Sequence, residues 1–270
     1  IYHEYTHNVV FSIYSGLAFP YLGQTGGMNE GWADYFAATI NNDPVMGENI
    51  FPTPIRNLEN NLRYPNNYNP EPHVASTVFS HAIWEIRQSI GAELTDSIVL
   101  NAMKLTPMTF SEFVEAMITV DDDNGNLNDG TPHINEICHA FWDNHGIFSN
   151  YCRGFVETPV VYVTSPFPNE VVVGSIPIIG EVYPSKYGVS VEYTLKFGDV
   201  EFGHYNEGEF IGFLGNVNTR LLSEGINYLT IDALDSGGKL YNFSIPLDVD
   251  NLQVTSLREG EILRPGKIIE

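Results

Sequence analysis

Two short stretches decide how the fold of this chain is interpreted: HEYTH at residues His3–His7 and GGMNEGWAD at residues Gly26–Asp34. Residues four apart on an α-helix lie on one face, so His3 and His7 can direct two imidazoles at the same point. Zinc binds neutral imidazole nitrogens, and a catalytic zinc site uses three protein ligands and leaves one position open. The first stretch therefore predicts a helix that supplies two histidines to a zinc ion.

The third ligand is expected from the second stretch. Glu30 follows His7 after 22 intervening residues and lies four residues before Asp34. We expect the Glu30 carboxylate to bind the ion, and the Asp34 carboxylate to hold the free ring N–H of a zinc-binding histidine. Glu4 is turned slightly aside, which suits a general base that takes a proton from an attacking water. The alternative is a surface or core helix that carries these residues by accident, and it requires both linked motifs to arise by chance.

The segment Asn29–Phe36, NEGWADYF, together with the preceding Gly26–Met28, resembles the fungalysin family of secreted metallopeptidases and, more distantly, thermolysin. Both are gluzincins, a class named for its glutamate ligand. The resemblance covers roughly residues 1–150. It implies a mainly helical lobe that carries the zinc ion, with a protein or peptide substrate lying across the face of the metal.

The same resemblance suggests roles for two further side chains. Tyr21 stands nine residues before Glu30, where thermolysin-like enzymes have a tyrosine whose phenol donates a hydrogen bond to the developing oxyanion. Arg56 falls where these enzymes have an arginine that binds the substrate carbonyl next to the cleavage point. A packed aromatic ring and a solvated arginine are the alternatives that stay open.

His73, in the stretch EPHVAS, stands where thermolysin-like enzymes have a histidine that faces the zinc ion and donates to the tetrahedral intermediate. In those enzymes an aspartate five residues earlier orients this histidine. That position is Tyr68 here, so the partner is open and Glu71 is a candidate. A helix cap or surface role is the alternative for His73. His81, two turns further along, is expected to be structural.

A calcium site is a second cofactor expectation, after zinc. Asp122, Asn124 and Asn126 have the alternate spacing of a calcium loop. The pattern then departs from an EF-hand, because Leu127 stands where glycine is required and His133 where a glutamate should be. Related peptidases carry a similar DGTP stretch before their last helix. A calcium site and a solvated turn both stay open.

The composition excludes some classes of partner. The formal net charge is −22, with only 12 lysines and arginines, which argues against nucleic acid or an anionic membrane as a partner. The sequence has no apolar run of about 18 residues, so we expect no membrane span. Cys138 and Cys152 are the only cysteines, and we expect them to form a disulfide of a secreted, extracellular protein, with two reduced thiols as the alternative.

The hydrophobic pattern changes after Cys152. Before it, helices are expected at residues 1–16 and 28–41, from near His73, at about 93–105 and 109–119, and from Pro132 to Gly146, with loops at 17–27 and 51–72. After it, short β-branched or aromatic runs predict an all-β sandwich. These runs are Val160–Thr164, Ile176–Val182, Val189–Phe197, Glu209–Phe213, Ile226–Ala233 and Lys239–Val249.

These patterns predict a multidomain chain. Residues 1–153 form a helical zinc-peptidase lobe, residues 156–250 an immunoglobulin-like β-sandwich, and residues 251–270 a linker or the start of a further module. The sandwich resembles the immunoglobulin-like modules of secreted bacterial enzymes, which implies a tether to a surface or substrate. Because Ile1 lies two residues before the first ligand, we expect a preceding β-rich lobe to be missing from this chain.

The sequence therefore predicts a secreted zinc endopeptidase. Two rivals stay open. One is a gluzincin aminopeptidase, which needs acidic residues to bind a free α-amino group. The other is a fragment that binds zinc, or adheres to a surface, without catalysing hydrolysis.

Overall fold

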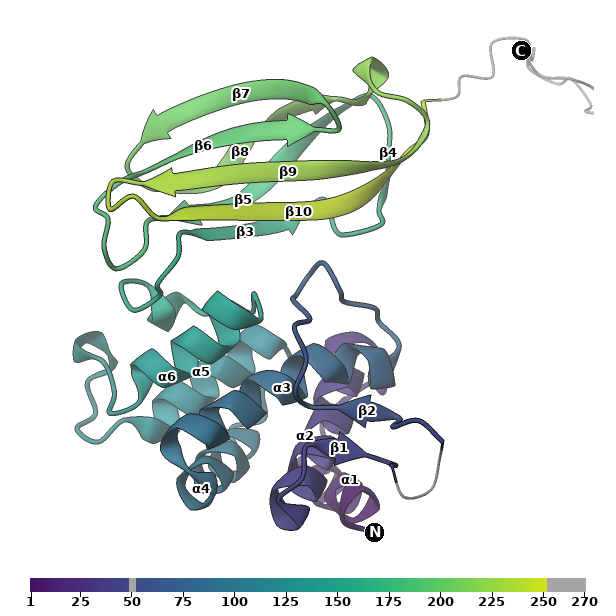
Figure 1. The fold of residues 1–270 in the computed structure, drawn as a ribbon, viewed down its shortest axis with the longest axis vertical. Helices are drawn as coiled ribbons and strands as arrows, with labels where there is room; N and C mark the ends of the chain where they lie inside the picture. The colour runs from purple at the N-terminus through teal and green to yellow at the C-terminus, as the bar shows by residue number, and fades with distance from the viewer. Residues whose placement is uncertain (49–51, 252–270) are drawn as a thin grey trace, which may run out of the picture.

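The computed structural model describes residues 1–48 and 52–251, in which a helical lobe is followed by a β domain (Figure 1). Most of the segment expected to be a linker or further module, 251–270, lies outside the described residues. The helices of the lobe are α1 (Tyr2–Ile13), α2 (Gly23–Asn41), α3 (Pro72–Ile90), α4 (Ala92–Met103), α5 (Phe110–Asp121) and α6 (Ile134–Cys138), and a π-helical turn, η2 (His139–Asn144), follows α6. No helix in the described ranges is long and apolar enough to cross a membrane.

Helix α2 begins five residues earlier than the sequence pattern predicts. The glycines at its start have low helix propensity, and we therefore expected a loop up to residue 27. Close packing against α3 explains the difference. A Cβ atom on Gly27 would lie 2.7 Å from Cβ of Ala75, and one on Gly31 would lie 2.5 Å from Cδ1 of Phe79. Only glycine allows this approach, so tertiary packing outweighs local propensity here.

The segment predicted as a loop at 51–72 contains a short strand. Strand β2 (Arg56–Asn57) pairs antiparallel with β1 (Val45–Met46), so that Met46 lies opposite Arg56. Strands of two residues have no periodicity that a sequence pattern can reveal. The hairpin matters because it brings Arg56 to the side of α2.

The hydrophobic core of the helical lobe lies between α2, α3 and α5. Trp32, Phe79 and Phe113 are fully buried and contact one another edge to face or at a tilt. Helix α1 packs on α2 through Val10, which is buried, whereas Val9 beside it is only half-buried. Burial of one side of α1 leaves its opposite side exposed.

The last helix of the lobe begins at Ile134 rather than at Pro132 as predicted. Thr131 does not cap it, because its hydroxyl donates to Oδ2 of Asp121. Cys138 and Cys152 form a disulfide, which joins α6 to the 3₁₀ turn η3 (Asn150–Cys152) that precedes the β domain.

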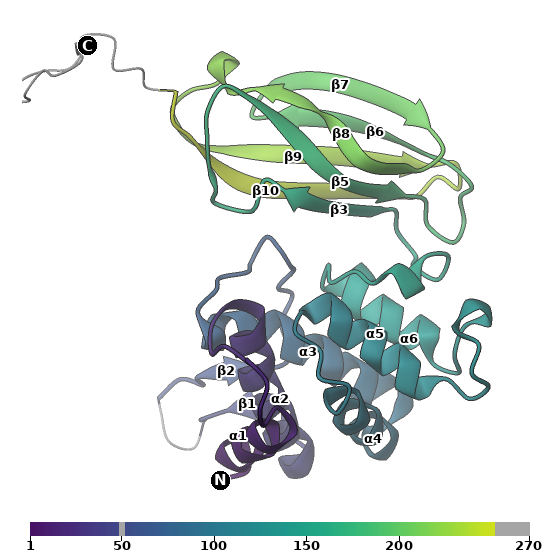
Figure 2. The ribbon, with the colours of Figure 1, turned by 180° about the vertical axis from the view of Figure 1, so that it is seen from behind.

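The β domain consists of two sheets around a second hydrophobic core. One sheet has the strand order β4-β10-β9-β6-β7, in which only the β4–β10 pair is parallel, and the other has the antiparallel order β3-β5-β8 (Figure 2). The strands are β3 (Val160–Ser165), β4 (Val171–Val172), β5 (Ser175–Tyr183), β6 (Val191–Phe197), β7 (Val200–Glu207), β8 (Phe210–Asn218), β9 (Gly225–Asp235) and β10 (Leu240–Val249). The sequence pattern missed β4 and β7.

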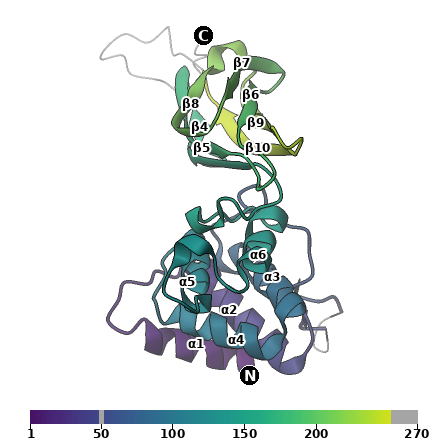
Figure 3. The same cartoon turned by 90° about the vertical axis from the view of Figure 1, so that its left-hand side faces the viewer.

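The two parts of the chain meet at η2 and the loop before α3 (Figure 3). The Arg63 guanidinium donates to the carbonyl oxygens of Trp142, Asp143 and Asn144, and to the hydroxyl of Tyr241 on β10. The Trp142 and Tyr241 rings lie 5.2 Å apart. The N-terminus lies at the opposite end of the helical lobe from the β domain (Figure 1).

Candidate active site

Three of the predicted side chains converge between α1 and α2. Nε2 of His3 lies 3.1 Å from Nε2 of His7 and 3.3 Å from Oε2 of Glu30. Nε2 of His7 lies 3.5 Å from Oε1 of Glu30. Ligands about 2.0–2.1 Å from a tetrahedral zinc ion are about 3.4 Å apart, so the spacing suits zinc. Oε2 of Glu30 is also buried without a hydrogen-bond donor, which a cation would satisfy. The residues therefore fit a zinc ion.

The outer ring nitrogen of each histidine faces an acceptor. Nδ1 of His3 lies 3.0 Å from Oδ1 of Asp34, and Nδ1 of His7 lies 2.8 Å from Oδ1 of Asn29. A hydrogen on each Nδ1 would leave the Nε2 lone pairs directed at the cluster. The sequence analysis identified Asp34 but missed Asn29. Its position directly before Glu30 in the second motif was the only signal available.

Arg56 is held by Asp34 at the edge of the cluster. Its Nε and Nη2 donate to Oδ2 and Oδ1 of Asp34 at 2.6 and 2.7 Å, and Nη2 lies 3.8 Å from Oε2 of Glu30. Asp34 is completely buried, so its charge needs both His3 and Arg56 as partners. The predicted contact of Arg56 with a substrate carbonyl stays a prediction.

The charges of the cluster are strongly coupled. Burial alone lowers the pKa of His3, but the Asp34 and Glu30 carboxylates outweigh it and raise that pKa to about 9. Burial raises the pKa of Glu30, yet the nearby His3 imidazole and the hydrogen bond from the Tyr21 hydroxyl lower it to about 2. In the absence of a metal ion the cluster therefore holds a proton on His3 near neutral pH, at the point where a cation fits.

The predicted catalytic residues share one open hollow of about 580 Å³, which is lined by His3, Glu4, His7, Asn8, Phe11, Tyr21, Asn29, Glu30 and His73. Glu4 is exposed on α1 at its edge. The Tyr21 hydroxyl donates to Oε1 of Glu30, and its partial burial and this bond raise its pKa, so the phenol keeps its proton. Helices α1, α2 and α3 and the loop before α2 thus bring acid, base and ligand groups together.

His73 enters this hollow from the start of α3. Its Nε2 lies 3.5 Å from Oε2 of Glu30, and its Nδ1 lies 2.7 Å from Oε1 of Glu71. Tyr68, which stands five residues before His73, packs instead against Tyr64 and Phe110. The partner of His73 is therefore Glu71, the residue that caps α3.

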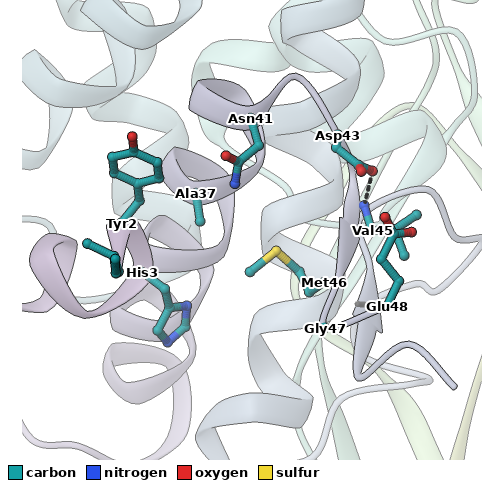
Figure 4. Close-up of a pocket in the computed structure, with 10 residues that line it drawn as sticks. Tyr2, His3, Ala37, Asn41, Asp43, Val45, Met46, Gly47 and Glu48 are labelled. Carbon is teal, nitrogen blue, oxygen red and sulfur yellow. Dashed lines mark hydrogen bonds between the residues drawn. The ribbon is translucent and has the colours of Figure 1, made fainter. Parts of the chain in front are cut away.

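A second hollow, of about 460 Å³, lies on the other side of His3 between α1, α2 and the hairpin (Figure 4). Met46 points from β1 toward the helices, opposite His3 and Ala37. The Asp43 carboxylate accepts from the backbone N–H of Val45 and orders this turn. The hollow lies directly beside the cluster, with His3 in its lining.

A second pair of histidines has a different hydrogen-bonding pattern. Nε2 of His81 and Nε2 of His145 lie 3.4 and 3.5 Å from Oε1 of Glu85. His145 faces an acceptor through Nδ1, the Leu62 carbonyl oxygen, as a metal ligand would. Nδ1 of His81, however, accepts the backbone N–H of Asn60, so its proton is on Nε2. His81 therefore lacks the lone pair that a metal ion requires and is structural, as expected.

The predicted calcium loop is held by internal hydrogen bonds. The Asp122 carboxylate accepts from the backbone N–H of Asn124, and the Asn124 side chain accepts from the backbone N–H of Asn126. The amide nitrogens of Asn124 and Asn126 both face the Asp129 carboxylate. The turn is exposed, and calcium binding stays a prediction.

Comparison with known proteins concerns mainly the helical lobe. Residues 17–147 match a family model described as the alpha-helical domain of thermolysin metallopeptidases. This range contains Tyr21, Glu30, Asp34, Arg56 and His73 and ends before the β domain. No curated protein matches the chain.

Three solved structures that match are only distantly similar to this chain. An engineered protein has a TM-score of 0.24 at 17% identity, over 34% of this chain and 20% of its own. CopC from Methylosinus trichosporium OB3b has a TM-score of 0.22 at 15% identity, over 34% of this chain and 96% of its own. An endo-beta-1,4-mannanase from Thermotoga petrophila has a TM-score of 0.29 at 12% identity, over 92% of this chain and 71% of its own. Taken with the geometry, the family match makes the helical lobe similar to the helical domain of thermolysin metallopeptidases and supports a metallopeptidase.

Proposed function

We propose that this chain is the zinc-binding part of a secreted endopeptidase that hydrolyses internal peptide bonds with water as the nucleophile. One observation carries the proposal: His3, His7 and Glu30 have the spacing of zinc ligands in the same hollow as Glu4 and His73. The disulfide and the strongly acidic composition support an extracellular location.

Each residue of the proposed site has a separate role in peptide hydrolysis. His3, His7 and Glu30 would hold a zinc ion, which would supply a Lewis acid that polarises a carbonyl and makes water easier to deprotonate. Glu4 takes the proton from the attacking water and passes it to the leaving amine. His73 donates a hydrogen bond to the oxyanion, the Tyr21 hydroxyl turns away from Oε1 of Glu30 to donate a second one, and Arg56 holds the substrate backbone.

The proposed mechanism is tested with the Glu4→Gln variant. Glutamine keeps the size of the side chain but cannot take a proton, so hydrolysis of a peptide should fall by about 10²–10⁴-fold while zinc content, measured by metal analysis, stays at one ion per chain. Glu93→Gln, an exposed substitution at the start of α4, is the matched control and should have wild-type activity. Unchanged hydrolysis in Glu4→Gln would contradict the mechanism.

The two rival functions separate by substrate. An aminopeptidase requires a free α-amino group, so a peptide with an acetylated N-terminus is cut only by an endopeptidase. A zinc-binding fragment without catalytic activity cuts neither peptide, although it retains the ion. Cleavage of the acetylated peptide, lost in Glu4→Gln, is the result that we expect.

We also propose that the β domain is an immunoglobulin-like sandwich that tethers the enzyme to a surface or substrate. Its support is the strand order, in which two packed sheets exchange consecutive strands as immunoglobulin-like folds do. No described residue of the β domain lines the hollow of the proposed zinc site, which is consistent with a role in attachment rather than catalysis.

A further inference from the structure

The loop that precedes α3, residues 59–64, is held from two sides by buried histidines. The backbone N–H of Asn60 donates to Nδ1 of His81, on α3, at 3.0 Å. The carbonyl oxygen of Leu62 lies 2.7 Å from Nδ1 of His145, which directly follows η2. Both imidazoles are almost completely buried, and their ring centroids lie 4.4 Å apart. Two titratable side chains therefore fix the backbone of this loop.

The same loop carries the arginine that joins the helical lobe to the β domain. Arg63 donates to three carbonyl oxygens of η2 and to the hydroxyl of Tyr241 on β10, and its guanidinium carbon lies 5.4 Å from the centre of the Tyr241 ring. The loop packs tightly on the turn after η2, where a Cβ atom on Gly146 would lie 2.1 Å from the carbonyl oxygen of Tyr64. The contact of Arg63 with β10 therefore depends on how the loop is held.

The hydrogen bond from Asn60 determines which atom of His81 an added proton can bind. A neutral imidazole that accepts through Nδ1 carries its hydrogen on Nε2, which here lies 3.4 Å from Oε1 of Glu85. A second proton must therefore bind Nδ1, which then becomes a donor. The backbone N–H of Asn60 would face another N–H group and lose its acceptor. A charged His81 is thus incompatible with the observed position of the loop.

The surroundings of His81 keep its imidazole uncharged near neutral pH. Burial, together with the nearby His145 imidazole, lowers the pKa of His81 to about 4. The carboxylates of Glu85 on α3 and Glu59 in the loop oppose this shift only in part. Oε1 of Glu85 already faces both imidazoles, and Oε1 of Glu59 accepts from the side chain of Gln88. Release of the loop would expose the ring to water and return its pKa toward 6.5, so the released form takes up a proton more readily.

We propose that His81 makes the junction between the helical lobe and the β domain sensitive to acid. Protonation of Nδ1 releases the loop that carries Arg63, and the docking of the β domain loosens while both parts stay folded around their own hydrophobic cores. The ratio of the released to the docked form should rise by at most about 10-fold for each pH unit between pH 6.5 and 4. Above pH 6.5 the junction stays closed.

The fluorescence of Trp142 can follow the state of the junction. Its ring is buried and lies 5.2 Å from the ring of Tyr241, so a looser junction exposes it to a neutral quencher such as acrylamide. In wild type we expect quenching to increase as the pH falls from 6.5 to 4, whereas the far-ultraviolet circular dichroism stays constant. The increase should be lost in Trp142→Phe, in which the ring that becomes exposed no longer contributes to tryptophan fluorescence.

The His81→Asn variant separates the proton from the hydrogen bond. The amide oxygen of asparagine can accept the backbone N–H of Asn60, but the amide does not take up a proton in this pH range. Quenching in this variant should stay at its neutral-pH level down to pH 4. His204→Asn, which replaces an exposed histidine on β7, is the matched control and should behave as wild type. Arg63→Gln should show the high quenching already at pH 7.

Three results would overturn the proposal: an equal increase in His81→Asn and wild type, no increase in wild type, or low quenching in Arg63→Gln at pH 7. Loss of the circular dichroism signal together with the increase also overturns it, because the whole chain then unfolds. If His81→Asn does not fold, hydrogen exchange measured by NMR on wild type decides. The backbone amide of Asn60 should lose its protection over the same pH range, and retained protection overturns the proposal.

Discussion

Replacing Asp34 with asparagine measures how much a buried carboxylate contributes to metal binding without altering a proposed ligand. Asp34 is completely buried, lies 3.0 Å from Nδ1 of His3 and accepts two hydrogen bonds from Arg56. Asparagine has nearly the same size but only one acceptor and no charge. Its single acceptor oxygen must serve both His3 and Arg56, so the charged acceptor behind His3 is lost.

The expected magnitude follows from two opposing effects. Loss of an acceptor behind a zinc-binding histidine costs about 10- to 100-fold in metal affinity, or roughly 1.4–2.7 kcal/mol. Against this, zinc competes with a proton, because the pKa of His3 is about 9 in the metal-free cluster. At pH 7 that competition lowers the apparent affinity of wild type by about two powers of ten.

The apparent zinc affinity should depend on pH. Zinc binds only the neutral ring, so the apparent affinity of wild type should rise with pH and become constant above the pKa of His3, about 9. Asp34→Asn removes a group that raises this pKa and so weakens the proton competition. The variant should therefore lose the full 10- to 100-fold near pH 9 but less near pH 7.

The assay is a competition titration with a chromophoric chelator near both pH values. Unfolding of the metal-free variant by urea is measured alongside, because Arg56 also loses its partner and stability should fall. Asp121→Asn, which alters a different buried carboxylate at the end of α5, is the control and should leave zinc affinity unchanged. Equal zinc affinity of Asp34→Asn and wild type at both pH values would refute the reasoning.

Three further predictions concern stability. Burial lowers the pKa of His81 to about 4 from the 6.5 of the unfolded chain. As the pH falls from 6.5 to 4, the free energy of unfolding should therefore decrease, by at most about 1.4 kcal/mol per pH unit. Urea unfolding of His81→Asn should lack this part of the pH dependence, and a pH dependence identical to that of wild type would contradict the prediction. Cys152→Ser opens the loop that the Cys138–Cys152 disulfide closes, whose ends are 14 residues apart in the sequence. The free energy of unfolding measured in urea should fall by about 3 kcal/mol, and reduction of wild type should lower it equally. An unchanged free energy of unfolding after reduction would contradict the prediction. Gly31→Ala places a Cβ atom 2.5 Å from Phe79 and should cost about 1–3 kcal/mol, seen as a lower thermal midpoint, whereas an unchanged midpoint would mean that α3 moves freely.

Helical spacing made the two halves of the ligand cluster predictable, and the packing of α1 on α2 brings them together. His3 and His7 share a face of α1, and Glu30 and Asp34 share one of α2, so each pair is fixed by a separation of four residues. The general division into a helical lobe and a β domain followed from the change of periodicity after Cys152, in the same way.

The remaining features depend on contacts between elements that are distant in the chain. The bond of Arg56 to Asp34 requires a hairpin of two-residue strands, which leaves no pattern in the sequence. The early start of α2 depends on how closely α3 approaches Gly27 and Gly31. The role of Asn29 depends on which way the ring of His7 turns, and helix periodicity does not determine that.

The π-helical turn η2 gives the molecule a junction that does not depend on the continuity of the backbone. Oδ1 of Asp143 accepts the backbone N–H groups of Glu157 and Thr158 at the entrance to the β domain, and the Asn144 side chain donates to Glu85 on α3. Arg63 joins the same turn to β10. A protease that cut the chain at Gly154 should therefore release neither half, and the two pieces should migrate together until a denaturant separates them.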